Sequence, residues 1–518
     1  MRLTVLIPSL CALAASVFAS QPNIVLIVTD DQNIESFGAY GANVHTPNMD
    51  QLASEGVRFD QAYAVTSVCS PSRYAILTGR YPGRCTHPRF DLVSPAGDIA
   101  RISNKSIGLE RDRPSLVRAL KQSGYTTGIV GKWHLGKWMA GWKQDGEWRF
   151  PPGFYEMGLQ AYPSDAPLDD PELSAALAHN QEVYRKELSA YGWDFARSIY
   201  WCNPRELHHD QLYNHNQEWL TARAIDFIEQ QEDTPFFLYL ATTIAHSPDP
   251  QDTLDRGDDP RGTGAGWTDA FLDSQPPRAG LAERVNNAGA PADTAYLTWL
   301  DDGIGAILKA LEEKGVREDT LVILTSDHGL QGKATLYESG VHVPLIINWP
   351  GRIQPGVQNE PVQHLDLVPT LLELANIEPA DMTLDGRSLA PLLSAKATEG
   401  PGRDSLYFEY GYARAVRRGP WKYIAVRYPE GTREAFARGE MDRLPYLGHN
   451  RTLGRWQAPR FQNYYVADQL YHLGQDPAEE NNLAENPRYA DVLKQMKDTL
   501  SQHLRYAPER PYGELKRP

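Results

Sequence analysis

Residues 23–31 read Asn-Ile-Val-Leu-Ile-Val-Thr-Asp-Asp, an apolar run that ends in two adjacent acids. A β-branched and leucine-rich run of this length is typical of a strand that is buried on both faces, as strands of parallel sheets are. In open α/β sheets, ligands bind beyond the carboxyl ends of such strands. We therefore expect residues 24–28 to form a strand of a mainly parallel sheet, with Asp30 and Asp31 at its binding edge.

Further apolar runs end in polar residues in the same way. They are Leu321–Leu324, followed by Asp327 and His328; Thr126–Val130, followed by Lys132 and His134; and Phe236–Leu240, followed by His246. Helical patterns at 114–123, 220–230 and 295–315 suit the crossover connections between parallel strands. The sequence therefore predicts an α/β fold in which several polar strand ends converge on one pocket.

The chain is long enough for more than one domain. Its 518 residues exceed what one hydrophobic core usually serves, so we expect one large and one small domain. A polar segment with glycines and a proline at 394–404 is the expected linker. Beyond it, the pattern indicates short strands at 405–408, 415–417 and 421–426 and a terminal helix at 487–506. We expect a large N-terminal domain at 20–395 and a smaller C-terminal domain, with a short antiparallel sheet, at 403–518.

The N-terminus has the pattern of an export signal. Met1 and Arg2 precede an uncharged apolar run at 3–19 that ends in small residues. The sequence predicts a signal peptide at 1–19 and a secreted or periplasmic protein. The alternative, a membrane anchor, is less favoured because the run is short, contains Pro8 and lacks a basic flank.

The charge balance restricts the possible partners. A formal net charge of −15 argues against a nucleic-acid-binding protein. An anionic substrate would have to be attracted by a local cationic pocket, because the field of the whole molecule repels it. Export would permit a disulfide between Cys85 and Cys202, but two free thiols are an equally open alternative. The sequence leaves the oligomeric state open.

A third cysteine, Cys69, lies at the expected start of a short helix. Ser70 can cap this helix, Pro71 suits its first position, and Gly79 ends it. Cys69 would then face free backbone N–H groups and the positive end of the helix dipole, which favour an anion. The residues alone therefore allow a nucleophile or an anion site, or else a buried structural cysteine.

The stretch around Cys69 resembles the signature of the type I sulfatases of the alkaline phosphatase superfamily. Residues 69–80 match every fixed position of Cys-x-Pro-Ser-Arg-x-x-x-Leu-Thr-Gly-Arg, and residues 131–136 match a family hexapeptide. The resemblance implies an α/β/α sandwich with its catalytic centre in the N-terminal domain. It also implies that a maturation enzyme oxidises Cys69 to Cα-formylglycine, whose hydrate attacks a sulfate ester.

The resemblance also implies a metal site. Asp30, Asp31, Asp327 and His328 offer hard oxygen ligands and one imidazole, a set suited to a divalent cation. Any one of these aspartates would more commonly be a turn or cap residue. The family keeps its metal ligands at these positions, together with the residue at position 69, so we expect Ca2+, with Mg2+ as an alternative.

The remaining expected site residues are basic. Arg73, Lys132 and Lys333 lie at positions that match the sulfate-contacting residues of the family, although such side chains taken singly are usually solvated surface charges. They would neutralise the oxygens of the transferred group. The resemblance implies that His246, with Lys333, protonates the departing alcohol and that His134 takes a proton from the hydrate.

The expected activity is hydrolysis of sulfate esters, with a sulfated saccharide as substrate. One alternative is a phosphate or phosphonate monoester hydrolase, and another is a catalytically silent protein that binds sulfated glycans. The stretches 145–216 and 248–293 are expected to be loops over the pocket, where specificity usually resides. The group His208, His209, Asp210 and His215 follows no strong metal-ligand spacing and is interpreted as a polar loop or a substrate-contacting wall.

Overall fold

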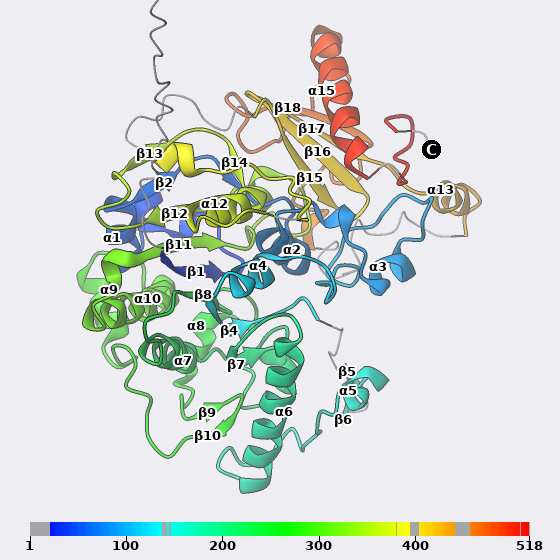
Figure 1. Ribbon diagram of the computed structural model, residues 1–518. Coiled ribbons are helices and arrows are strands. Elements are labelled where there is room, and N and C mark those ends of the chain that lie inside the picture. Colours follow the sequence, from blue (N-terminus) through cyan, green and yellow to red (C-terminus); the bar gives the residue numbers. More distant parts are fainter. Residues whose placement is uncertain are drawn as a thin grey trace, which may run out of the picture.

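The structure is a computed structural model that describes residues 21–136, 142–144, 147–379, 381–393, 403–440, 456–507 and 509–516 (Figure 1). The predicted signal peptide at 1–19 lies outside the described residues. So does most of the predicted linker at 394–404, and the domain boundary there stays a prediction. Within the described residues, no helix combines the length and the apolar character that a membrane crossing requires.

The centre of the molecule is an eight-stranded sheet in the order β13-β2-β12-β11-β1-β8-β4-β7. In sheet order, the strands are β13 (Gly356–Gln358), β2 (Val57–Phe59), β12 (Leu345–Asn348), β11 (Thr320–Ser326), β1 (Asn23–Thr29), β8 (Phe236–Ala241), β4 (Thr126–Lys132) and β7 (Phe195–Tyr200). All neighbouring pairs are parallel except the two that involve β12. The prediction of a mainly parallel sheet is confirmed.

The register aligns the carboxyl ends of the four central strands. Val28 of β1 pairs with Thr325 of β11 and with Ala241 of β8, which in turn pairs with Gly131 of β4. The polar residues that follow these positions therefore leave the sheet at one edge. This alignment explains how segments from four distant parts of the sequence form one site.

Helices cover both faces of this sheet. Alternate residues of β1 separate the two cores: Ile24, Leu26 and Val28 belong to one, and Val25 and Ile27 to the other. The first core includes residues of α2 (Cys69–Thr78), α4 (Leu116–Gln122) and α12 (Leu367–Leu374), and the second includes residues of α1 (Pro47–Ser54), α7 (Gln217–Glu229) and α10 (Ala295–Glu313). Figure 1 shows α12 on one side of the sheet and α7 and α10 on the other, which confirms the α/β/α architecture.

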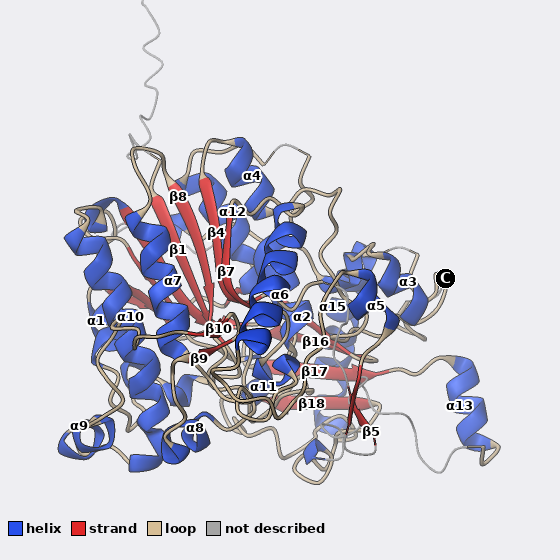
Figure 2. Ribbon diagram, turned by 90° about the horizontal axis from the view of Figure 1, so that it is seen from below, coloured by secondary structure: helices blue, strands red, loops and turns tan. Residues whose placement is uncertain are grey.

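A smaller antiparallel sheet follows in the C-terminal part. Its strands are β15 (Leu406–Tyr410), β16 (Ala413–Arg418), β17 (Trp421–Val426) and β18 (Asp468–His472), in that order. Met496 and Leu500 of helix α15 (Ala490–His503) share a core with Tyr423 and Leu470 on one side of this sheet. Residues of the other side pack with Tyr337 and other residues of the large domain. The predicted C-terminal sheet and terminal helix are confirmed (Figure 2).

The expectation of loops at 145–216 and 248–293 is partly wrong. The first stretch contains the long helix α6 (Pro171–Ser189) and the edge strand β7. Leu173, Leu177, Tyr184 and Leu188 recur at helical spacing and are buried, which explains the helix.

Short α-helices and strands elsewhere in the described chain complete the fold. They are β3 (Ala62–Tyr63), α3 (Pro88–Val93), β5 (Trp142–Gln144), β6 (Glu147–Arg149), α5 (Pro152–Glu156), α8 (Pro250–Arg256), β9 (Gly262–Thr263), β10 (Gly266–Trp267), α9 (Leu281–Asn287), α11 (Glu338–Val341), β14 (Val362–Gln363) and α13 (Glu430–Ala437).

Candidate active site

Helix α2 presents Cys69 at its N-terminus. The helix begins at Cys69 itself, two residues before the predicted start, and its last residue, Thr78, is followed by the C-cap Gly79, whose φ of 65° suits glycine. Ser70 does not cap it as predicted, because its hydroxyl donates to the His134 carbonyl at 2.6 Å. Asn104 takes that role, since its Oδ1 accepts from the backbone N–H of Ser70 at 2.9 Å. Cys69 is thereby held at the helix end and against the segment after β4.

The thiol of Cys69 lies among groups from three strand ends. Its Sγ lies 3.3 Å from Nε2 of His328, 3.4 Å from Nζ of Lys132 and 3.8 Å from Oδ1 of Asp30. One potential ligand atom from each of Asp30, Cys69, Asp327 and His328 lies within 4.8 Å of the others, and all four residues are buried. Among the described residues, this is the group that could hold a metal ion. The structure thus brings four of the five predicted metal ligands together.

Asp31, the fifth predicted ligand, lies at the border of this group. Its carboxylate accepts from Nζ of Lys333 at 2.6 and 2.9 Å and lies 3.2 Å from Nε2 of His328. Its backbone N–H donates to Oδ1 of Asp327 at 3.1 Å. Burial alone would raise the pKa of Asp31, but the charge of Lys333 lowers it below its usual value. Asp31 is therefore anionic at neutral pH.

The predicted cations each face a carboxylate of the cluster. Nζ of Lys132 lies 2.5 Å from Oδ2 of Asp30, and Arg73 holds Asp327 through Nε at 3.1 Å and Nη2 at 2.9 Å. Burial would lower the pKa of Lys132, but Asp30 raises it above the usual value. These cations stay charged and form a positive wall beside Cys69.

The two predicted histidines lie at the same edge. Burial lowers the pKa of His246 to about 4, and its Nε2 lies 4.0 Å from Oδ2 of Asp31. His134 is buried, its backbone N–H donates to the Trp201 carbonyl at 2.8 Å, and burial and the charge of Lys132 lower its pKa well below the usual value. Both rings are therefore neutral at pH 7, the form in which His134 can accept a proton, whereas His246 can donate one only after it has taken one up.

The encoded thiol is a poor nucleophile. Burial raises the pKa of Cys69 far above its usual value, although Lys132 and Lys333 act in the opposite direction. The thiolate is the reactive form of cysteine, so Cys69 is unreactive at neutral pH. This favours chemistry by another atom at position 69. Cys85 and Cys202 are also buried free thiols, so the alternative of a disulfide between them is not realised.

Sequence reasoning missed several supporting residues. His364 contacts Ser72 Oγ through Nδ1 at 3.2 Å and Thr325 Oγ1 through Nε2 at 3.1 Å. It thus joins α2 to β11 behind the site. Asn104 is distant in sequence from the helix that it caps, and no local signal indicated that role.

The histidines at 208–215 have different surroundings. His215 contacts Thr243 Oγ1 at 2.8 Å and the carbonyls of His246 and Pro248 at 2.9 Å, so it supports the segment that carries His246. His208 lies against Phe150 and other aromatic rings. These contacts agree with a polar loop.

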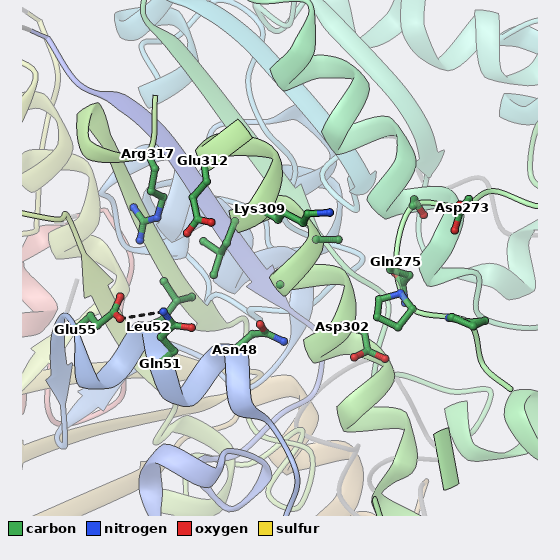
Figure 3. A pocket seen from close by; sticks show the side chains of 16 residues that line it. Asn48, Gln51, Leu52, Glu55, Asp273, Gln275, Asp302, Lys309, Glu312 and Arg317 are labelled. Carbon is green, nitrogen blue, oxygen red and sulfur yellow. Dashed lines mark hydrogen bonds between the residues drawn. The ribbon is translucent and has the colours of Figure 1, made fainter. Parts of the chain in front are cut away.

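A hollow of about 600 Å³ lies between α1, α10 and the segment 273–277 (Figure 3). Glu55, Glu312, Lys309 and Arg317 are among the residues that line it, whereas none of the predicted site residues does. Its lining carries side chains of both charges. It is therefore separate from the cluster around Cys69.

The model of the sulfatase family matches residues 22–377, which is more than half of the chain. The chain belongs to the sulfatase family. Human arylsulfatase A is 32% identical over 94% of this sulfatase and 89% of its own length. The N-acetylgalactosamine-6-sulfatase of Canis lupus familiaris is 29% identical over 96% and 88%, respectively. The protein is thus a sulfuric ester hydrolase.

Solved structures share the fold of this sulfatase. One of them, solved in complex with its substrate D-glucosamine-2-N,6-O-disulfate, has a TM-score of 0.58 and 19% identity, with coverage of 96% of this chain and 100% of that chain. The sulfatase family uses a metal ion and a formylglycine residue. The group around Cys69 is the place in this sulfatase where the chemistry of its donor atoms suits both.

Proposed function

We propose that this sulfatase hydrolyses sulfate esters of carbohydrates through a formylglycine formed from Cys69 and a bound divalent cation. The observation that carries the proposal is the position of Cys69 Sγ, which lies within 3.8 Å of Asp30 and within 3.4 Å of Lys132 and His328. An oxygen nucleophile in place of this sulfur would lie beside both the acidic ligands and the positive wall.

The donor set fits a hard divalent cation. Asp30 and Asp327 supply buried carboxylate oxygens, His328 supplies Nε2, and the side chain at position 69 faces all three. Asp31 lies next to His328 and can add a further oxygen. Oxygen-rich sets of this kind favour Ca2+, with Mg2+ as the alternative. When bound, such a cation polarises sulfate and hydrate oxygens.

The side chains of the protein would neutralise charge on the sulfate and transfer protons. Arg73, Lys132 and Lys333 neutralise the charge on the sulfuryl oxygens, and fixed donors of this kind are worth most in a water-poor site. His246 and Lys333 protonate the leaving oxygen together: the His246 ring is neutral at rest, so the charged Lys333 ammonium is the source of the proton. After one hydroxyl of the hydrate has bonded to sulfur and the ester S–O bond has broken, His134, held by its backbone against Trp201, would accept the proton of the remaining hydroxyl, so that the bond to sulfate breaks and the aldehyde returns.

Two lines of reasoning support a carbohydrate substrate and an exported protein. N-acetylgalactosamine-6-sulfatase is named for an amino sugar, and a structural neighbour has a sulfated glucosamine as its substrate.

The apolar N-terminal run at 3–19 suits a signal peptide that delivers the enzyme to the extracellular space or the periplasm. A formylglycine-generating enzyme is the partner that maturation requires.

The decisive experiment combines two measurements on protein from its native source. Peptide mass analysis should find residues 69–80 with an aldehyde in place of the thiol. The purified protein should then release sulfate from a panel of sulfated mono- and disaccharides, with 4-nitrophenyl sulfate and 4-nitrophenyl phosphate compared in parallel. An unmodified thiol in active native protein would refute the formylglycine proposal, and faster phosphate cleavage would favour the monoester phosphatase alternative.

A further inference from the structure

A residue of the C-terminal part of the chain reaches into the loop that carries Lys333. Gln457 is fully buried, and its side-chain Nε2 donates to two main-chain carbonyls, that of Lys333 at 2.7 Å and that of Gln331 at 3.0 Å. One amide group thus closes both ends of the turn from which the Lys333 side chain leaves. This contact joins residues more than one hundred positions apart in the sequence.

The turn needs external support. Ala334, directly after Lys333, has a φ of 66°, a left-handed conformation that residues other than glycine adopt uncommonly. Such a conformation persists where surrounding contacts hold it. The carbonyl of Ser67, two residues before Cys69, accepts from the Ala334 N–H at 3.2 Å. In the C-terminal part of the chain, Gln457 holds the carbonyl of the preceding residue, Lys333, and the Tyr464 hydroxyl donates to the Ala334 carbonyl at 3.2 Å.

The amide of Gln457 acts in this turn through its donor group. Its Oε1 is buried and accepts no hydrogen bond from the described residues, whereas Nε2 serves two acceptors. Because an unpaired buried polar atom is costly, the two bonds of Nε2 are the contribution that this amide makes to the turn. The residue whose backbone this donor holds is Lys333, and the Nζ of Lys333 lies 2.6 Å from Asp31 at the edge of the site.

We infer that Gln457 is a positioning residue that fixes the Lys333 ammonium where it assists departure of the alcohol oxygen. The inference rests on the role given to Lys333 in the proposed function. Loss of the Gln457 donor leaves two carbonyls without their partner and lets the turn relax, so that Nζ moves relative to the ester oxygen. Small misplacements of a catalytic group lower rates strongly.

The test uses the dependence of the rate on the leaving group. Assistance to the departing oxygen matters more for poor leaving groups, so misplacement of Lys333 should slow phenyl and 4-methylphenyl sulfate more than 4-nitrophenyl sulfate. For Gln457→Leu, we expect kcat/KM to fall about tenfold further for phenyl sulfate than for 4-nitrophenyl sulfate. Rates are normalised to formylglycine content, measured by peptide mass. Gln457→Asn, which keeps the amide but withdraws it by one methylene, provides a second variant if Gln457→Leu does not fold.

Gln469→Leu is the matched control. Gln469 is also buried, and its Nε2 also bridges two carbonyls, those of Asn463 at 2.8 Å and Val466 at 3.1 Å. Neither carbonyl belongs to the Lys333 turn. Its Oε1 also accepts from the hydroxyls of Tyr337 at 2.8 Å and Tyr471 at 3.1 Å, so its loss should lower stability at least as much as loss of Gln457. It should change kcat/KM by the same factor for every ester.

Comparison with Lys333→Ala separates the two proposals. A Gln457→Leu effect that vanishes in the Lys333→Ala background supports positioning of Lys333. If Lys333→Ala depends on the leaving group and Gln457→Leu does not, the role given to Gln457 is wrong. If Lys333→Ala itself shows no such dependence, the role of Lys333 in the proposed function is wrong, and this inference fails with it.

Discussion

Arg73 directs two nitrogens at a single oxygen of Asp327, with Nε at 3.1 Å and Nη2 at 2.9 Å from Oδ2. A lysine has one nitrogen and cannot reproduce this fork. The remaining guanidinium nitrogen, Nη1, lies 3.4 Å from the Tyr239 hydroxyl, so the group is fixed on both sides. The arginine thus orients a carboxylate of the cluster and presents a rigid positive charge to it.

We predict that Arg73→Lys lowers kcat/KM for 4-nitrophenyl sulfate by about a hundredfold to a thousandfold, the range known for loss of a fixed charge-stabilising donor. Arg84→Lys is the control, because Arg84 forms a similar fork on Asp385 away from the cluster, with Nε and Nη2 each at 2.8 Å from an oxygen. That variant should lose stability and retain its rate. Equal rates for both variants would contradict the role given to Arg73.

Removal of the divalent cation should lower both activity and thermal stability. Asp30 and Asp327 are buried close together, and a bound cation offsets their mutual repulsion. An ion that binds only the folded state at a hundredfold excess over its Kd adds about 2.7 kcal/mol to the free energy of unfolding. Melting curves with EDTA, which binds both Ca2+ and Mg2+, and after addition of either ion measure the effect. A melting temperature that EDTA leaves unchanged would count against a resident cation.

The fold and much of the site follow from local sequence patterns. The run 24–28 and the acids behind it predict a buried strand with ligands at its end, because strand burial and strand direction are encoded in a few adjacent residues. The resemblance around Cys69 then assigns chemistry to positions that the sheet register brings together. The proximity of the candidate residues was predictable because each of the segments that carry them has a signal of its own, whereas the roles of these residues stay predictions.

The supporting contacts could not be predicted in this way. Asn104 caps α2 and Gln457 holds the Lys333 turn through hydrogen bonds between distant segments. Neither residue has a neighbour in sequence that marks its partner. The predicted start of α2 was wrong. Ser70 and Pro71 locally favour a helix that begins after Ser70, but the Ser70 hydroxyl donates to the His134 carbonyl and does not cap the helix. Tertiary contacts override such preferences.

A buried lysine of the small C-terminal sheet should contribute strongly to the free energy of unfolding, because it joins that sheet to the segment that carries Glu338. Nζ of Lys422 on β17 lies 2.9 Å from Glu338 and 3.1 Å from Glu479, and Lys422 is fully buried. Lys422→Ala removes the cation from the buried carboxylate of Glu479 and the partly buried carboxylate of Glu338, which should reduce the free energy of unfolding by about 3–5 kcal/mol. Melting temperature and chemical denaturation measure this loss.

Lys497→Ala is the matched control for that prediction. Lys497 also pairs with an acid, Asp468, at 3.0 Å, but both side chains are about 30% exposed. Exposed pairs contribute about 1 kcal/mol or less, so this variant should melt close to the wild type. Similar melting temperatures for the two variants would show that the buried pair does not stabilise the contact.

The glycine before Lys132 should tolerate no side chain. Gly131 has a φ of 92°, and a Cβ there would lie 2.0 Å from the main-chain oxygen of Ala241 on β8. Gly131→Ala must therefore push β4 away from β8 and shift Lys132, the next residue, away from Asp30. A displacement of about 1 Å can lower the rate about a hundredfold. We predict losses of both melting temperature and kcat/KM for 4-nitrophenyl sulfate.

Gly124→Ala separates steric collision from backbone strain. Gly124 has nearly the same φ, 91°, but a Cβ there would meet no atom within 4 Å. The left-handed conformation alone should reduce stability by about 1–2 kcal/mol and leave the rate intact. If Gly131→Ala behaves like Gly124→Ala in both measurements, the approach of β8 does not set the position of Lys132. A rate loss confined to Gly131→Ala would instead show that close strand packing places the cation beside Cys69.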